Sequence, residues 1–366
     1  MEIIEGEGRA ADGGIVVEDC FNLLLNLLKM NYSNQNFFKE ANYIKMLCKY
    51  LDLTENGNSS AVNNLASDLG DPNNSGAWTV QKTTNLSLLL KLIRCLVSPT
   101  NQQVIINDCQ KAFNHFGMLH RLCAMLMMPG VPADLLSEAI GTVGEVIRGN
   151  AANQQLFSAV QMQTNPPRPI LVILLMSMIN EKQTFHLRCS ILYSFECFLF
   201  RNEKAKSEIV ETLLPQHSSS SSAAAVAEQI NIGQILCSGL ISQQDFVSNW
   251  LCGVALSHTI SDNNQLKEQL LRVQLAVNPA NNLQSVSLMQ QCMLILIEST
   301  TDTTSTTTQT SGLNSTQVSQ NKCKLQTTVS MLMLLSTWMS NCSSAVNYFL
   351  NHPQNIPYVV ILILIK

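Results

Sequence analysis

A loosely recurring pattern of short polar junctions constrains the fold of this chain more than any other feature of its sequence. The junctions centre on six positions: Asn34, Asn101, Asn153, Ala205, Asn264 and Ser344. The residue three positions earlier is Asn or Ser in every case, and the residues six before and four after are apolar in five of the six. The clearest copies read NYSNQNFF and NAANQQLF. Recurrence of this kind predicts a repeat protein.

The chemistry of these junctions indicates a break between two helices. The first Asn or Ser is expected to end one helix, because Asn tolerates the left-handed conformation at a helix C-terminus. The second is expected to accept a backbone N–H as the N-cap of the next helix. Apolar residues on either side would then pack the two helices together. The alternative is that a composition rich in Asn and Ser produces such junctions by chance.

Three low-complexity inserts account for the uneven spacing of the junctions. Successive anchors are 67, 52, 52, 59 and 80 residues apart, and the inserts lie at about 54–76, 217–228 and 299–320. Because polar tracts of small residues cannot bury a core, we expect disordered surface loops there. Without them the period is roughly 45 to 55 residues, near the upper end of the armadillo and HEAT range.

Between the junctions the apolar residues follow a helical period. In LSLLLKLIRCLVS the polar residues Ser87, Lys91, Arg94 and Ser98 form one narrow stripe on an otherwise apolar segment, as expected of an inner helix covered by its neighbours. The segment 133–148 has an apolar face of its own, with a proline before it and a glycine after it as start and stop signals. No run of alternating strand pattern stands out. The sequence therefore predicts an all-α fold, an armadillo/HEAT-like helical solenoid over residues 1–366.

Composition narrows the class of function. Charged residues make up 13% of the chain and the net charge is −4, so nothing favours phosphate backbones and we expect no nucleic-acid partner. The longest apolar stretches are too short to cross a bilayer, and the acidic N-terminus is unlike a secretory signal. Twelve cysteines lie in apolar runs without a CxxC pair, which indicates reduced, buried thiols of a cytosolic protein.

Groups that could bind a phosphate or a metal each have a simpler explanation. The GxG in GEGRAADGG has no strand before it and no P-loop Lys after it, so we interpret it as a loop. His115 and His120 are five residues apart and off a common helical face. His186 and Cys189 could share a face, but no second pair completes a tetrahedral site. We therefore expect no cofactor and no metal.

Catalytic residues are not predicted either. Ser257, His258 and Asp262 contain the residue types of a triad, but a triad is defined by geometry and not by adjacency in one stretch. No GxSxG elbow occurs. The chain is therefore not expected to be an enzyme, and a long binding surface for other proteins is the usual function of a solenoid.

Two further groups of residues are candidates for binding sites. Arg148, Arg188 and Arg272 stand near predicted helix ends, where capping of carbonyls or pairing with a neighbouring repeat explains them better than a ligand. The segment NPPRP at 165–169 cannot be helical and is expected to be an ordered connector. It is also our candidate for a partner-binding feature, through Pro166, Pro167 and Arg168.

Long, idiosyncratic segments give the chain a resemblance to a known family. Residues 12–44, 130–157, 165–202, 265–276 and 331–342 resemble the globular head of the Golgi vesicle tethers known as general vesicular transport factors. The resemblance implies an armadillo-like head in a homodimeric, cytoplasmic protein that is peripheral on Golgi membranes and transport vesicles. It also implies a Rab-type small GTPase, golgins and SNARE proteins as partners. It carries over no catalytic residues.

The chain departs from that family at both ends. DGGIVVEDC lies well inside the family's head, and the coiled coil and acidic tail would follow beyond NIPYVVILILIK, so we expect a partial head. Two alternatives stay open. A nuclear-import cargo adaptor would need Trp and Asn recurring at the repeat period, which Trp78, Trp250, Trp338 and Asn26 do not provide. An enzyme subunit would need a pocket with convergent ionisable groups.

Overall fold

The structure is a computed structural model, and it describes residue 4 and residues 14–51, 78–162, 164–214, 231–242, 245–275, 286–306, 315–352 and 355. Almost all of these residues are helical, which confirms the predicted all-α fold. The chain divides into two compact units. Unit 1 comprises residues 1–171 and 184–201, and unit 2 comprises residues 172–183 and 202–366.

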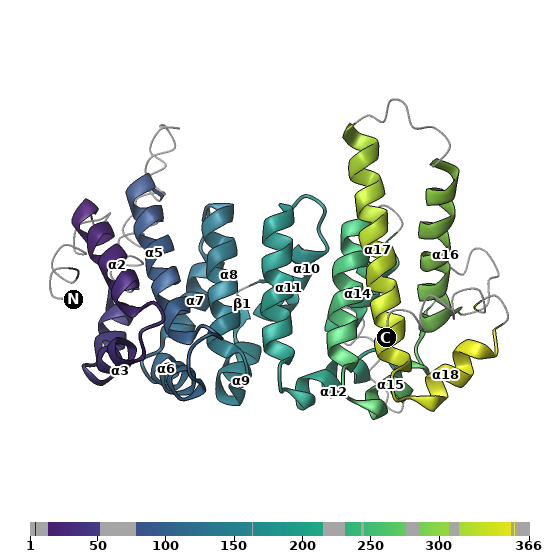
Figure 1. Ribbon diagram of the computed structural model, residues 1–366, viewed down its shortest axis with the longest axis horizontal. Helices are drawn as coiled ribbons and strands as arrows, with labels where there is room; N and C mark the ends of the chain where they lie inside the picture. Colours follow the sequence, from purple (N-terminus) through teal and green to yellow (C-terminus); the bar gives the residue numbers. More distant parts are fainter. Residues whose placement is uncertain are drawn as a thin grey trace. The chain divides into compact units, whose positions relative to one another are not determined.

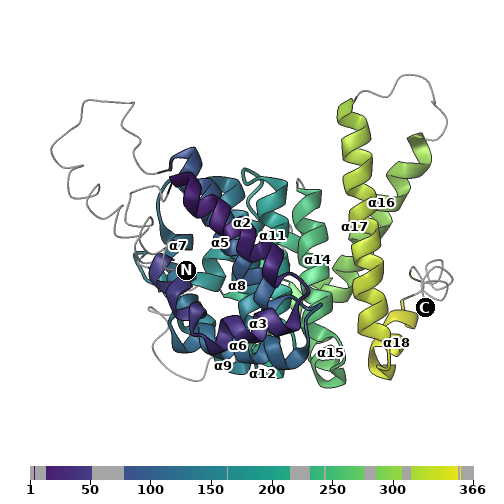
Figure 2. The same cartoon turned by 60° about the vertical axis from the view of Figure 1, so that its left-hand side comes forward.

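Unit 1 contains a row of long helices with shorter helices beside it (Figure 1). The long helices are α2 (Gly14–Leu28), α5 (Val80–Val97), α8 (Ala133–Ile147) and α11 (Phe185–Leu199). The shorter helices are α3 (Tyr32–Glu40), α6 (Gln103–His115), α7 (Met118–Met127) and α9 (Ala151–Ala159). We call the row of long helices the inner row. Figure 2 shows α3, α6 and α9 along its lower ends.

Unit 2 repeats the same alternation of long and short helices. The long helices are α14 (Phe246–Ile260), α16 (Leu288–Thr306) and α17 (Ser315–Met339), and α14 and α17 pack against each other. The shorter ones are α12 (Glu203–Glu211), α13 (Ile232–Leu240), α15 (Asn264–Leu270) and α18 (Ser343–Leu350). Helix α10 (Ile170–Met178) has all but its first two residues in this unit.

Helix α5 shows why such a sequence forms an inner helix. Thr79 caps its N-terminus by accepting a hydrogen bond from the N–H of Lys82 at 3.2 Å. Its leucines and isoleucine are buried, whereas Lys91 and Arg94 are exposed and Ser87 is half-buried. The narrow polar stripe predicted from the sequence is therefore confirmed, and the rest of the helix surface packs against its neighbours.

The helix junctions are confirmed, but the predicted roles of the two polar residues hold at only some of them. Ser98 and Ser261 end a helix as predicted, and Asn341 follows α17 in the left-handed conformation with a φ of 55°. Asn31 and Asn150, expected to end a helix, are N-caps and accept from the N–H groups of Asn34 and Asn153, each at 3.1 Å. The second asparagine instead ends the preceding helix, since the side chain of Asn153 donates to the carbonyl of Val146 at 2.9 Å. A side-chain amide reaches these carbonyls directly, so no left-handed asparagine is needed at the first position of these junctions.

Two further N-caps follow the same rule in unit 2. Asn202 accepts from the N–H of Ala205 at 3.2 Å, and Asn263 accepts from that of Leu266 at 3.1 Å. The fifth junction is therefore displaced by two residues from the predicted frame, in which Ser261 took this place. Ser261 is the C-cap of α14.

Two short β-hairpins were not predicted. Strands β1 (Gln161–Met162) and β2 (Arg168–Pro169) pair antiparallel, as do β3 (Gln274–Leu275) and β4 (Val286–Ser287). NPPRP lies on the first hairpin, which confirms that it is an ordered, non-helical connector. Strands of two residues are too short to show an alternating pattern in the sequence.

The predicted inserts fall largely outside the described residues. This holds for 54–76 and 217–228 in full, and for 307–314 within the third. The prediction of loop over the remainder of 299–320 is wrong, because α16 continues to Thr306 and α17 begins at Ser315. Extending an existing helix costs far less than nucleating one, so the apolar parts of these helices carry their turns into the polar tract.

Candidate functional site

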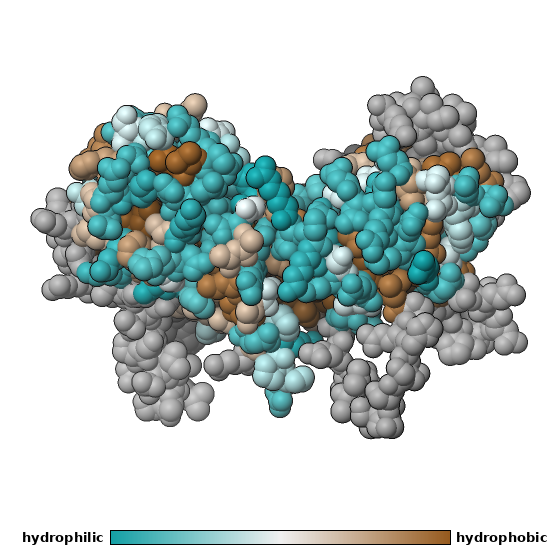
Figure 3. All heavy atoms as spheres, turned by 90° about the horizontal axis from the view of Figure 1, so that it is seen from below, coloured by the Kyte–Doolittle hydropathy of each residue, from teal (hydrophilic) through white to brown (hydrophobic). Residues whose placement is uncertain are grey.

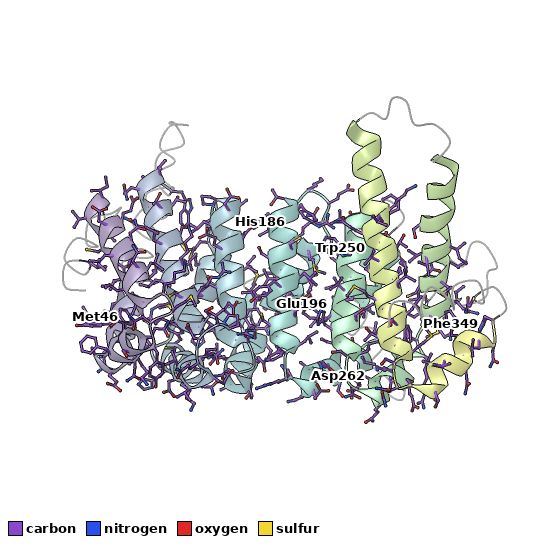
Figure 4. All side chains as sticks on the ribbon, in the orientation of Figure 1. Met46, His186, Glu196, Trp250, Asp262 and Phe349 are labelled. Atoms are coloured by element: carbon purple, nitrogen blue, oxygen red, sulfur yellow. The ribbon has the colours of Figure 1, made fainter. Side chains whose placement is uncertain are left out.

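The exposed surface of the repeats is the candidate functional site, because stacked helical repeats offer a long surface to other proteins. His115 ends α6 and His120 lies on α7. Figure 4 shows His186 near the start of α11, well away from Glu196 on the same helix. No group of three His, Cys, Asp or Glu side chains in the described part of the chain is arranged to hold a metal ion.

The residues of the apparent triad do not act together. Ser257 is buried and donates its hydroxyl hydrogen bond to the carbonyl of Gly253 at 2.9 Å. Asp262 is an exposed junction residue with a φ of 59°, and it is labelled beside α12 in Figure 4. The Ser257 hydroxyl is therefore hydrogen-bonded within its own helix.

The cysteines are core residues, as predicted, within the described part of the chain. Eleven of the twelve cysteines have described side chains, and these are free thiols, eight of them buried and three half-buried. Burial raises the pKa of Cys109, Cys123 and Cys237 to about 12 each. These thiols are neutral at physiological pH and are neither nucleophiles nor metal ligands.

Polar contacts tie the inner-row helices of unit 1 together. Glu138 on α8 accepts a hydrogen bond from Ser87 of α5 at 2.6 Å. Glu145, with its side chain 7% exposed, accepts from the Tyr193 hydroxyl of α11 and pairs with Nε of Arg148 at 3.2 Å. Burial is the main cause that raises the pKa of Tyr193, so its hydroxyl stays a hydrogen-bond donor. The row therefore presents its exposed side chains from a fixed frame.

A second set of contacts was missed by the sequence analysis, and we call these contacts straps. In each strap, one buried long side chain on a short helix donates to carbonyls at the end of a long helix from the next repeat. Gln110 donates to the carbonyls of Glu145 and Arg148 at 3.1 and 3.0 Å. Gln154 donates to those of Cys197 and Phe200 at 3.2 and 2.9 Å. Each strap satisfies carbonyls that a helix end leaves open.

Lysine takes the place of glutamine in the straps of unit 2. Lys267 donates to the carbonyl of Ser340 at 2.7 Å, and Lys206 lies 3.4 Å from that of Ser261. A cation at a helix C-terminus also interacts favourably with the helix dipole. Gln154, Lys206 and Lys267 all stand four residues after an Asn N-cap, and this spacing is the sequence signal that would have revealed them.

The candidate contacts on NPPRP are accessible. Pro166 and Pro167 are exposed and Arg168 is half-buried on β2. The carbonyl of Pro166 accepts from the hydroxyl of Thr164 at 2.6 Å, so the turn is held by its own side chain. Seen from below in Figure 3, the described surface is mainly hydrophilic with separate hydrophobic patches.

The tryptophans do not support a peptide groove of the nuclear-import kind. Trp338 is fully buried, and its indole N–H donates to the carbonyl of Lys267 at 2.8 Å. It is therefore a core residue and cannot stack on an extended peptide. None of the described helices has both the length and the apolar content that a bilayer crossing requires.

These features define a class of protein: an all-α repeat protein of the armadillo type. The family described as "Armadillo tether-repeat of vescicular transport factor" matches residues 75–135. The family described as "Uso1 / p115 like vesicle tethering protein, head region" matches residues 150–364. The chain therefore belongs to the Uso1/p115-like family of vesicle tethering proteins and matches its head region. Family membership, and not a missing feature, supports the prediction that it is not an enzyme.

Comparison with individual proteins supports membership of the same family. The chain is 46% identical over 98% of its length to human General vesicular transport factor p115 and 47% identical, also over 98%, to the mouse protein. It spans 32% of the length of each. A crystal structure of Uso1 superposes with a TM-score of 0.69 at 18% identity, covering 99% of this chain and 50% of that one. That similarity confirms the fold.

Proposed function

We propose that residues 1–366 form a partial tethering head, a non-catalytic scaffold that helps to hold transport vesicles at Golgi membranes before fusion. The observation that carries this proposal is membership of the tether family over residues 150–364. The straps and the Glu145 contacts support it, because they hold the exposed side chains of successive repeats in fixed register.

The mechanism follows from that rigidity. A scaffold with several recognition surfaces at set spacings binds one partner and raises the effective concentration of the next. A vesicle component and a target-membrane component held in this way stay close without any covalent step.

The proposed partners are proteins: a Rab-type small GTPase, golgins and SNARE proteins. Association with Golgi membranes and vesicles would then be peripheral and made through these partners, from the cytoplasm, with homodimerisation as a property of the longer proteins of the family. Pro166, Pro167 and Arg168 are candidate contacts, supported by the exposure of the two prolines.

Capture of defined trafficking proteins tests the proposal. The immobilised chain is incubated with cytosol and detergent-solubilised Golgi membranes, and bound proteins are identified by mass spectrometry. We expect Rab-type GTPases, golgins or SNAREs, with less of them on a variant carrying Arg94→Glu on the inner-row helix α5 than on one carrying Lys111→Glu on α6, both exposed positions. Recovery of nuclear transport factors alone would contradict the proposal and favour an import adaptor.

A further inference from the structure

One exposed edge of unit 1 is built unlike the corresponding places after α14 and α17. It consists of Arg148 and Gly149 after α8, and Phe200 and Arg201 after α11, and we call it the arginine edge. Phe200 is 45% exposed although it is a large apolar side chain. Aromatic side chains, Phe among them, and arginine are enriched at protein interfaces.

The ring of Phe200 lies against a glycine of the neighbouring junction. Gly149 has a φ of 68°, and a Cβ placed there would come within 3.2 Å of the ring. The ring therefore packs closely against the backbone of Gly149, and a larger residue there would have to displace it slightly and adopt a strained left-handed conformation. The guanidinium carbons of Arg148 and Arg201 lie 5.9 and 5.2 Å from the ring centroid, within the range of a cation–π contact.

Hydrogen bonds from buried side chains also fix the backbone of the arginine edge. Gln110 and Gln154 bind the carbonyls of Arg148 and Phe200, and Glu145 orients Arg148 through its Nε. A surface fixed in this way loses little conformational entropy when a ligand binds, so more of the contact energy appears as affinity.

The equivalent positions after α14 and α17 carry small polar residues, whereas Lys29 and Met30 follow α2. Ser261 and Asp262 follow α14, and Ser340 and Asn341 follow α17. Asp262, Asn341 and Arg201 all have a left-handed backbone, with φ between 55° and 59°. Asn and Asp tolerate that conformation better than a long side chain does. The arginine at 201 is therefore not explained by the backbone and points to a use for its side chain.

The free hydrogen-bonding capacity of the edge indicates the chemistry of its ligand. Within the described residues, Arg201 makes its contact with Phe200 and no hydrogen bond or ion pair, and Arg148 pairs through Nε alone. Guanidinium groups bind carboxylates in paired hydrogen bonds. Two arginines on a chain of net charge −4 do not suit a polyanion, which needs many cationic contacts.

We propose that the arginine edge docks a short acidic segment of a protein partner, with a carboxylate on the guanidinium groups of Arg148 and Arg201 and an apolar side chain on Phe200. The proposal rests on the proposed scaffold function only in that the chain binds proteins. It adds the place of contact and the class of segment bound there.

A peptide probe tests it directly. The probe is a fluorescein-labelled peptide of alternating glutamate and leucine, with a matched peptide carrying glutamine in place of glutamate. We expect the acidic probe to bind the full chain and the glutamine probe to bind at least tenfold more weakly. Arg201→Gln should weaken acidic-probe binding about tenfold, equivalent to about 1.4 kcal/mol, whereas Lys111→Gln, the same charge change on exposed α6, should not.

Two further variants separate docking from stability. Arg201→Lys keeps the charge and should restore part of the affinity, and Phe200→Leu keeps an apolar side chain and should weaken both probes alike. Thermal unfolding of Arg201→Gln should match the unchanged chain, because its side chain is exposed. Equal loss with Lys111→Gln would overturn the proposal, as would Arg201-dependent binding to phosphatidylserine vesicles without peptide binding.

The outcome is distinguishable from failure of the proposed function. If trafficking proteins are captured equally by the Arg201→Gln variant and the probe does not bind, the edge is wrong and the scaffold function stands. If the probe binds through Arg201 but no trafficking protein is captured, the edge stands and the tethering function is wrong.

Discussion

The strap made by Gln154 should be worth a large part of the stability of unit 1. Its side chain is 2% exposed and donates to the carbonyls of Cys197 and Phe200. In Gln154→Ala both hydrogen bonds are lost. The hydrogen bond to the carbonyl of Phe200 is only partly buried, so water can replace it and its loss costs about 1 kcal/mol. The hydrogen bond to the carbonyl of Cys197 is buried, so that carbonyl stays unsatisfied at a cost of about 1–3 kcal/mol.

The expected total is therefore about 3 kcal/mol, in a protein whose free energy of unfolding is on the order of 5–15 kcal/mol. Gln155 supplies the matched control, because it is the next residue on α9 and is exposed. Gln155→Ala should change the stability by less than about 0.5 kcal/mol. Urea unfolding followed by circular dichroism gives the two free energies.

Hydrogen exchange locates the effect. Gln154→Ala should increase exchange in the last turn of α11, although the substitution lies on α9, because the strap connects two repeats. Gln154→Lys should keep most of the stability, since Lys206 and Lys267 act from the same position after their N-caps. If Gln154→Ala costs no more than Gln155→Ala, or α11 exchanges unchanged, the interpretation of the strap is refuted.

Three further outcomes follow from unit 2 and from the thiols. Asn249 is buried and donates to three carbonyls at the end of α13. Asn249→Ala should therefore lower the free energy of unfolding in urea by about 2–4 kcal/mol. Asn249→Asp should lower it more, because a carboxylate repels those oxygens. Gly239→Ala would place a Cβ 2.5 Å from Sγ of a neighbouring cysteine. It should lower the free energy of unfolding by about 1–2 kcal/mol, after the gain in helix propensity is counted. Ser238 is exposed and adjacent, and Ser238→Ala should leave the stability unchanged. The pKa of Cys109 and Cys237 is raised to about 12 from 9.0. Above pH 9 the unfolded chain loses these protons first, so stability should fall between about pH 9 and 12, and iodoacetamide at pH 8 should leave both thiols unmodified until urea is added.

The sequence predicted the local features of this fold and missed those that depend on distant residues. Asn31 and Asn150 could be placed at junctions because an N-cap involves only the next three residues. Their roles were reversed because both a C-terminal cap and an N-cap favour asparagine, and composition does not distinguish them. The straps of Gln110 and Gln154 bind residues 35 to 46 positions away. The spacing after an N-cap could mark Gln154 as a strap residue, but it does not identify the carbonyls that the side chain binds.

The surface was still less predictable. Arg148 was expected to cap carbonyls or to pair with a neighbouring repeat, whereas its ion pair is with Glu145, three residues earlier on its own helix. Its relation to Phe200 and Arg201 could not be anticipated, because it depends on two inner helices ending side by side. Pro166 stays a prediction, since exposure alone does not identify a contact.

A longer repeating block is present in addition to the single repeat. Asn150 and Asn263 cap equivalent helices 113 residues apart, and each is followed ten residues later by a valine, in VQMQTNP and VQLAVNP. Each valine closes its hairpin through its carbonyl, at 2.9 Å to the N–H of Ile170 and 3.1 Å to that of Leu288. A pair of repeats, of which one carries a hairpin, is therefore the recurring block.

The arginine edge does not follow this duplication. The position of Arg148 after α8 corresponds to Ser261 after α14, with the same backbone role and a different side chain. The repeated block thus preserves the caps, straps and hairpins that hold the helices, while the exposed positions vary. A scaffold that binds several different partners needs this separation, since identical surfaces on every block would compete for a single partner.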